Sequence, residues 1–234
     1  PKGIKRAISD ENYEGAAMTS SFDLVIKGGL VVDGTGNPWL KKDIGITNGK
    51  ITRLGHITEY NSETIDVTGM IVSPGFIDLH NHSDFSILAY PNAESYIMQG
   101  VTTVVVGNCG LSLAPVNPNK LALLKRYLLP FLRVGHNYGW EWRTLAEFYE
   151  KVERQGISLN LAPLVGQGTI RLAVKGLDST ESSAEEMNQM KKLLAQSLEG
   201  GAFGMSTGLI YPPGSYSTTE ELIVQLQKVR THHK

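Results

Sequence analysis

Short runs of alternating hydrophobic and polar residues, separated by tight turns, make up residues 22–70. The clearest turn is Asn48-Gly49, which separates residues 43–47 from residues 50–54. Asn-Gly between two alternating runs is a strong signal for a β-hairpin. We expect strands at residues 23–27, 30–32, 43–47, 50–54, 64–67 and 70–72. The pattern predicts a small antiparallel β unit.

After Pro74 the pattern changes to apolar strand-like runs that alternate with amphipathic helical segments. Residues 101–106 are β-branched throughout, as expected of a parallel strand buried on both faces. Within residues 183–200, methionines and leucines recur at helical spacing, so we predict a helix whose methionines belong to the core. Strands are expected at 76–79, 101–106, 157–162 and 202–207, and helices at 93–99, 119–132, 144–155, 169–174, 183–200 and from 218 onward. This alternation predicts a parallel sheet flanked by helices, either an open sheet or a barrel.

Two histidines follow the first of these strands, which we expect to be short and buried. Side chains two residues apart on a strand point the same way, so His80 and His82 are predicted to project together. Two neutral imidazoles that converge in this way can hold a divalent metal ion. Ser83 and Asp84 come next and could hydrogen-bond around them. The competing interpretation is that the histidines are simply solvated or capped at the strand end.

The single cysteine, Cys109, follows the next strand and lies between Gly107 and Gly110. A lone cysteine is most often a small buried hydrophobic residue. Three functional alternatives remain open at this point: a metal ligand, a nucleophile or a redox sensor. A thiolate and imidazoles together suit zinc, whereas a nucleophile needs an adjacent base, for which His80 or His82 could serve.

The residues that carry chemistry all come after strands. His80 and His82 follow one strand, Cys109 follows the next, and Tyr211 follows a later one. In a β/α barrel the catalytic groups gather at the carboxyl ends of the strands. The order therefore favours one site on one rim of the sheet.

Composition narrows the classes of partner. The chain has 234 residues, 41% of them hydrophobic and 19% charged, as in globular proteins. A net charge of −1 with both signs interspersed gives no case for nucleic acid or a membrane surface as partner. One cysteine allows no internal disulfide and favours a reducing compartment, so we expect a cytoplasmic protein. Residues 1–21 have no periodic pattern and are expected to be a tail or a cloning remnant. If Met18 is the natural start, residues 1–17 are a remnant or upstream translation.

Three segments, residues 73–84, 100–110 and 204–213, resemble the N-acyl-D-amino-acid deacylase (D-aminoacylase) family of the amidohydrolase superfamily. The resemblance extends over residues 22–230. The His-x-His pair alone marks only the superfamily. The Gly-Asn-Cys-Gly and Ser-Thr-Gly-Leu-Ile-Tyr sequences are more specific, because most relatives use a carboxylated lysine or a glutamate as the bridging metal ligand.

The resemblance implies both a fold and a site. Residues 22–70 would form strands of a small β-sandwich domain, and residues 71–234 the first part of a metal-dependent (β/α) barrel. His80, His82 and Cys109 would be ligands for one or two zinc ions. Tyr211 would contact the carboxylate of the substrate.

The function implied is zinc-dependent hydrolysis of the amide bond of N-acyl-D-amino acids, which releases a carboxylate and a D-amino acid. A (β/α) barrel needs about 250 residues, so the general-base aspartate of the last strand is expected beyond Lys234. Near the end, His232 and His233 follow Thr231 and superficially resemble a further metal motif of the family, although no strand is expected before them.

Two alternatives to deacylation stay open. The first is a cyclic-amide hydrolase of the same superfamily, acting on hydantoins or dihydropyrimidines. The second is a chain without catalytic activity that binds metal weakly. In either case the last strand of a partial barrel would present unpaired backbone groups, so self-association through an open sheet edge is expected.

Overall fold

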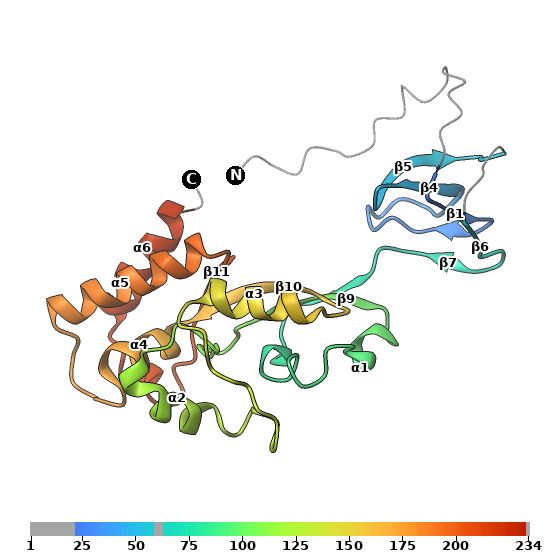
Figure 1. Ribbon diagram of the computed structural model, residues 1–234. Coiled ribbons are helices and arrows are strands. Elements are labelled where there is room, and N and C mark those ends of the chain that lie inside the picture. Colours follow the sequence, from blue (N-terminus) through green and yellow to red (C-terminus); the bar gives the residue numbers. More distant parts are fainter. Residues whose placement is uncertain (1–21, 59–62, 233–234) are drawn as a thin grey trace. The chain divides into compact units, whose positions relative to one another are not determined.

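The computed structural model describes residues 22–58 and 63–232, which form two compact units that divide between Pro74 and Gly75 (Figure 1). The expectations for residues 1–21 and for His233 lie outside the described residues. Within the described ranges, no helix has the length and apolar character needed to cross a bilayer.

The N-terminal unit consists of two small sheets. One has the strand order β5-β4-β1-β6 and the other β3-β2-β7. Their bounds are β1 Leu24–Lys27, β2 Leu30–Val31, β3 Leu40–Lys41, β4 Asp43–Thr47, β5 Lys50–Gly55, β6 Glu63–Asp66 and β7 Ile71–Val72. Since β7 pairs with β2, the N-terminal unit includes a strand that we had expected at the start of the barrel segment.

Strand pairing in this unit is mixed, so the prediction of an antiparallel unit is wrong in part. The predicted hairpin joins β4 and β5, and Asn48 and Gly49 both have positive φ, as a type I′ turn requires. In contrast, β1 pairs with β6 and β2 with β7 in parallel. These pairs join segments that are far apart in the sequence, and no local turn residue signals them.

The second unit is built on a parallel sheet of the order β11-β10-β9-β8, in which every strand lies beside its successor along the chain. The strands are β8 Phe76–Asp78, β9 Val101–Val106, β10 Asn160–Gly166 and β11 Gly204–Ser206. Helices occupy the connections: η1 Ser83–Phe85, α1 Glu94–Ile97, η2 Pro118–Lys120, α2 Leu121–Leu128, α3 Leu145–Gln155, α4 Gln167–Lys175, α5 Ala184–Glu199, η3 Gly214–Tyr216 and α6 Thr219–His232. Consecutive parallel strands joined through helices are the beginning of a β/α barrel, as predicted.

Local sequence explains where the longer helices begin. Thr144 accepts a hydrogen bond from the backbone of Glu147, whose side chain caps Thr144 in return, and this capping box starts α3. An equivalent box starts α5. On α5, Met190 and Leu194 are fully buried in the core, as the helical spacing predicted, whereas Met187 is only half-buried.

The expectation that β8 is buried is wrong. Phe76 is 61% exposed and Ile77 is 60% exposed. Among the described strands β8 has one neighbour, β9, so its side chains lack the second layer that buries a central strand. The four-stranded sheet thus has β8 and β11 at its edges, and self-association through such an edge stays a prediction.

A buried ion pair connects α4 to α6. The Arg171 and Glu221 side chains are 0% and 2% exposed, and the Arg171 Nη1 and Glu221 Oε2 atoms are 2.5 Å apart. The carboxylate also accepts from Gln167 Nε2 at 3.0 Å, and the guanidinium donates to the Thr180 carbonyl at 3.0 Å. With these partners both charges are compensated away from water.

We predict that Glu221→Ala lowers the free energy of unfolding by about 3–5 kcal/mol, because it leaves the Arg171 charge buried without its carboxylate. Urea unfolding followed by circular dichroism measures the change. The matched control is Glu220→Ala, an exposed neighbour on α6 whose loss costs at most about 1 kcal/mol. Equal midpoints for the two variants would contradict a stabilising role for the pair.

Candidate metal centre

The two histidines lie in the loop that follows β8, not on the strand itself. β8 ends at Asp78, and the Asp78 carboxylate accepts a hydrogen bond from the His80 backbone N–H at 3.1 Å. The His82 ring then stacks on Phe85 of η1, with ring centroids 5.8 Å apart. The two imidazoles do come close, with centroids 6.0 Å apart, but through a turn rather than through strand alternation.

The loop after β9 carries Cys109 in a left-handed backbone conformation, with φ of 56°. Gly107, two residues earlier, has φ of 76°, and a Cβ atom there would lie 2.0 Å from the Leu164 carbonyl oxygen of β10. Only glycine accepts both conditions. The chain therefore turns tightly against β10 and presents Cys109 at the carboxyl end of β9.

Two polar side chains hold this loop in place. Asn108 Nδ2 donates to the Asn81 carbonyl at 3.2 Å, so it joins the loop of Cys109 to the loop of the histidines. Ser206, at the end of β11, accepts from the Gly110 N–H at 2.9 Å and donates to the Gly107 carbonyl at 2.5 Å. Neither Asn108 nor Ser206 was expected to have a role. Both lie in the segments that carry the family resemblance, and this is the sequence signal that could have identified them.

His80, His82 and Cys109 form a cluster in which one potential ligand atom of each lies within 4.8 Å of the others. His80 Nε2 is 3.1 Å from the Cys109 sulfur. His82 Nδ1 is buried and has no hydrogen-bond partner among the described residues. Two imidazoles and a thiol are a donor set that fits zinc, and a buried ring nitrogen without a partner is consistent with a ligand position.

The electrostatic environment favours the neutral imidazole at His82. Burial, and then the neighbouring His80, lower the pKa of His82 below its usual value. A neutral imidazole has a free lone pair for a metal ion. The environment therefore maintains His82 in its ligating form at neutral pH.

Ser83 and Asp84, which follow the histidines, do not hydrogen-bond to the imidazole rings. Ser83 donates to the Asn81 side-chain oxygen at 2.7 Å. Asp84 is 2% exposed, and burial raises the pKa of its carboxyl group to about 7. Its Oδ1 atom has no hydrogen-bond partner in the described part of the chain.

Tyr211 reaches the cluster from the loop after β11. Its hydroxyl donates a short hydrogen bond to the carbonyl oxygen of Cys109. A Cβ atom at Gly208 would lie 2.0 Å from the same oxygen, so the two loops touch through their backbones. Burial, and then Cys109, raise the pKa of the Tyr211 phenol, which stays protonated at neutral pH. Tyr211 is thus beside the candidate metal centre, with its proton donated to the backbone.

His232 does not join this cluster. It is the last residue of α6 and therefore follows a helical turn rather than a strand. A role for His232 as a metal ligand stays a prediction.

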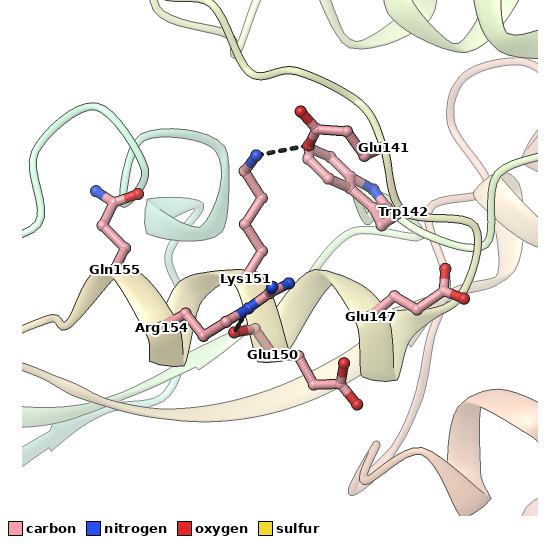
Figure 2. Close-up of a pocket in the computed structure, with 7 residues that line it drawn as sticks. All are labelled: Glu141, Trp142, Glu147, Glu150, Lys151, Arg154 and Gln155. Carbon is pink, nitrogen blue, oxygen red and sulfur yellow. Dashed lines mark hydrogen bonds and ion pairs between the residues drawn. The ribbon is translucent and has the colours of Figure 1, made fainter.

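A surface hollow along α3 is a separate feature, with a volume of about 590 Å³. Figure 2 shows Lys151 extended toward Glu141, and their charged atoms are 2.6 Å apart. Lys151 also lies over the ring of Trp142, 5.8 Å from its centroid. The hollow is lined by Glu141, Trp142, Glu147, Glu150, Lys151, Arg154 and Gln155. Its lysine is neutralised and none of the three clustered residues lines it, so we do not assign the chemistry to it.

Comparison with known families identifies the chain. The model of the amidohydrolase family matches residues 63–210. This range includes His80, His82 and Cys109 and ends one residue before Tyr211. This chain belongs to the amidohydrolase family.

Individual relatives of this amidohydrolase are deacylases of D-amino-acid derivatives. D-aminoacylase of Alcaligenes xylosoxydans xylosoxydans is 36% identical over 213 residues, which cover 90% of this chain and 43% of that enzyme. The solved N-acyl-D-glutamate deacylase of Bordetella bronchiseptica, in complex with zinc and a phosphonate mimic of the tetrahedral intermediate, has a TM-score of 0.79 and 33% identity. That match covers 92% of this chain and 44% of that one.

A third match concerns metal content. A solved D-aminoacylase, described as having a binuclear metal centre, has a TM-score of 0.77 and 36% identity, and the match covers 91% of this chain and 44% of that chain. The resemblance to the D-aminoacylases is confirmed by these matches. This chain spans less than half the length of each of these three relatives.

We predict that Cys109→Ala weakens zinc binding by this amidohydrolase chain at least about tenfold. Loss of a ligand should cost no less than loss of a hydrogen-bonded partner of a ligand, which typically costs 10–100-fold. Competition with a chromophoric chelator measures the dissociation constant. His56→Ala, whose side chain is 82% exposed on the other unit, controls for non-specific histidine binding. An unchanged affinity would return Cys109 to a purely structural role.

Proposed function

We propose that this protein is a zinc-dependent deacylase that hydrolyses the amide bond of N-acyl-D-amino acids. The observation that carries the proposal is the cluster of His80, His82 and Cys109, in a chain 36% identical to a D-aminoacylase. We further propose that one or two zinc ions bind at this cluster. The products are a carboxylate and a free D-amino acid.

The residues of this chain hold and orient the metal. When bound, zinc lowers the pKa of a water molecule and polarises the carbonyl oxygen of the amide. His82 contributes a neutral nitrogen from a buried position, and Cys109 is fixed by the backbone turn around it. Because both ligand loops are joined through Asn108, the distance between their ligand atoms is set before substrate binds.

In this proposal the general base is not one of the three clustered residues. The metal-ligand cluster of the described residues contains no carboxylate. We propose that an aspartate from a later strand of the barrel takes the proton of the attacking water and returns it to the departing amine.

Tyr211 is the proposed contact for the substrate carboxylate. Its hydroxyl donates to the Cys109 carbonyl in this structure, so binding a carboxylate requires an exchange of hydrogen-bond partner. The exchange places the carboxylate beside the metal cluster and on its β11 side. A carboxylate held there and a side chain held in a pocket would together select one enantiomer.

The remaining partners follow from the reaction. The partner is a small-molecule substrate, and no described feature calls for nucleic acid or a membrane. A reducing compartment such as the cytoplasm keeps Cys109 available as a thiol, and we propose that location.

The test of the function is hydrolysis by the zinc-loaded protein with its complete barrel. We expect release of the free amino acid from N-acetyl-D-amino acids, and a much lower rate with the L-enantiomers. Hydantoin and dihydrouracil are the comparison substrates. Preferential opening of these rings would overturn deacylation in favour of a cyclic-amide hydrolase, and no turnover of any substrate would leave a non-catalytic metal-binding protein.

We predict that Tyr211→Phe in this enzyme raises KM about tenfold or more with a modest loss of kcat. The lost hydrogen bond acts on a charged carboxylate in ground state and transition state alike. Steady-state kinetics with an N-acetyl-D-amino acid measure both constants. Tyr216→Phe, on the nearby η3, is the matched control, and kinetics of Tyr211→Phe equal to the control would remove Tyr211 from the site.

A further inference from the structure

A second aromatic ring, that of Phe131, lies against the histidine side of the cluster. Its centroid is 5.3 Å from the ring of His82 and 5.4 Å from that of Phe85. Phe85 is fully buried, whereas Phe131 is 40% exposed. Phe131 is therefore the most exposed ring of this group of three, and it has surface that a bound molecule can touch.

The position of this ring is fixed from both sides of the loop that carries it. The Phe131 N–H donates to the Leu128 carbonyl at 2.9 Å, which continues the last turn of α2. Farther along, the buried Tyr138 hydroxyl accepts from the Arg133 N–H and donates to the Phe85 carbonyl, both at 2.7 Å. The loop is thus tied to the backbone just after His82. These hydrogen bonds therefore fix the position of Phe131 beside the site.

The geometry of the substrate then decides which part of it meets Phe131. In an N-acyl amino acid, the acyl chain and the α-carboxylate extend from opposite ends of the amide. Tyr211, the proposed carboxylate contact, arrives from β11, whereas Phe131 packs on His82, which follows β8. These are opposite edges of the sheet order β11-β10-β9-β8. With the amide at the metal cluster and the carboxylate at Tyr211, the acyl chain extends toward Phe131.

We propose that Phe131 is the specificity-determining residue for the acyl group, and that it favours substrates with apolar acyl chains longer than acetyl. The inference rests on the proposed function and adds the acyl preference to it. An exposed aromatic face next to a reacting amide gains apolar contact with each methylene group of a linear acyl chain. Burial of one methylene is expected to raise kcat/KM by about two- to fourfold.

The test compares N-acetyl, N-propionyl and N-butyryl derivatives of the D-amino acid that reacts fastest, with wild-type protein and Phe131→Ala. We expect kcat/KM to rise along the series in the wild type, and the rise to be lost in Phe131→Ala. Because Phe131 also packs on His82, the quantity compared is the ratio of kcat/KM for butyryl to that for acetyl within each variant, which a general loss of activity does not change. Phe131→Leu keeps an apolar side chain and should retain most of the rise, and Leu129→Ala, a 62% exposed residue of the same loop, should retain all of it.

A second readout does not depend on turnover. Calorimetry with metal-free protein is expected to show tighter binding of the N-butyryl than of the N-acetyl derivative, and equal binding of the two by Phe131→Ala. The same dependence on acyl length in Phe131→Ala and wild type, in both measurements, would overturn the inference. So would a variant that changes the preference for the amino-acid side chain and leaves the acyl preference unaltered.

The same experiment separates this inference from the function on which it rests. Turnover of N-acetyl-D-amino acids by the wild type supports deacylation whatever the acyl-length series shows. A wild type that reacts with none of the three derivatives overturns the proposed function itself, and the acyl assignment with it. Zinc content equal to that of the wild type shows that a variant has kept the metal centre.

Discussion

The contact between the backbone at Gly107 and the Leu164 carbonyl is the constraint on which the rest of the site depends. A side chain at Gly107 would collide with β10, so the strand β9 can end in a tight left-handed turn only through glycine. That turn places the Cys109 sulfur against His80 and the Cys109 carbonyl against Tyr211. Three strand ends are thereby brought together by one steric requirement of the backbone.

Different forces hold the two sides of the cluster. The Cys109 side is held by hydrogen bonds to backbone groups, which fix distance and direction. The His82 side is held by ring packing against Phe85 and Phe131, which excludes water from the imidazole and lowers its pKa. The thiol is thus positioned by hydrogen bonds and the imidazole by apolar packing. These surroundings suit a metal centre with two chemically different ligands.

Sequence reasoning succeeded where the signal was local and failed where it depended on distant pairing. The β-branched run of β9 and the Asn48-Gly49 hairpin were predicted because their residues leave few alternatives. β10 was expected at residues 157–162 and lies at Asn160–Gly166, because pairing of Leu164 and its successors with β11 extends the strand past a proline. The His80 and His82 pair was found by spacing, yet a turn brings the rings together. The contact of Phe131 with His82 spans α1, β9 and α2, and no pattern in the sequence indicates it.

The Arg171–Glu221 pair has a consequence for the order in which this chain can fold. Arg171 lies on α4, and its carboxylate partner arrives fifty positions later on α6. While the chain is being synthesised, α4 can reach its buried position only at the cost of an unpaired charge, so a nascent chain that lacks α6 should keep this region open. Burial of α4 is thus linked to a helix that is made fifty positions later, and α4 and α6 are expected to become ordered together.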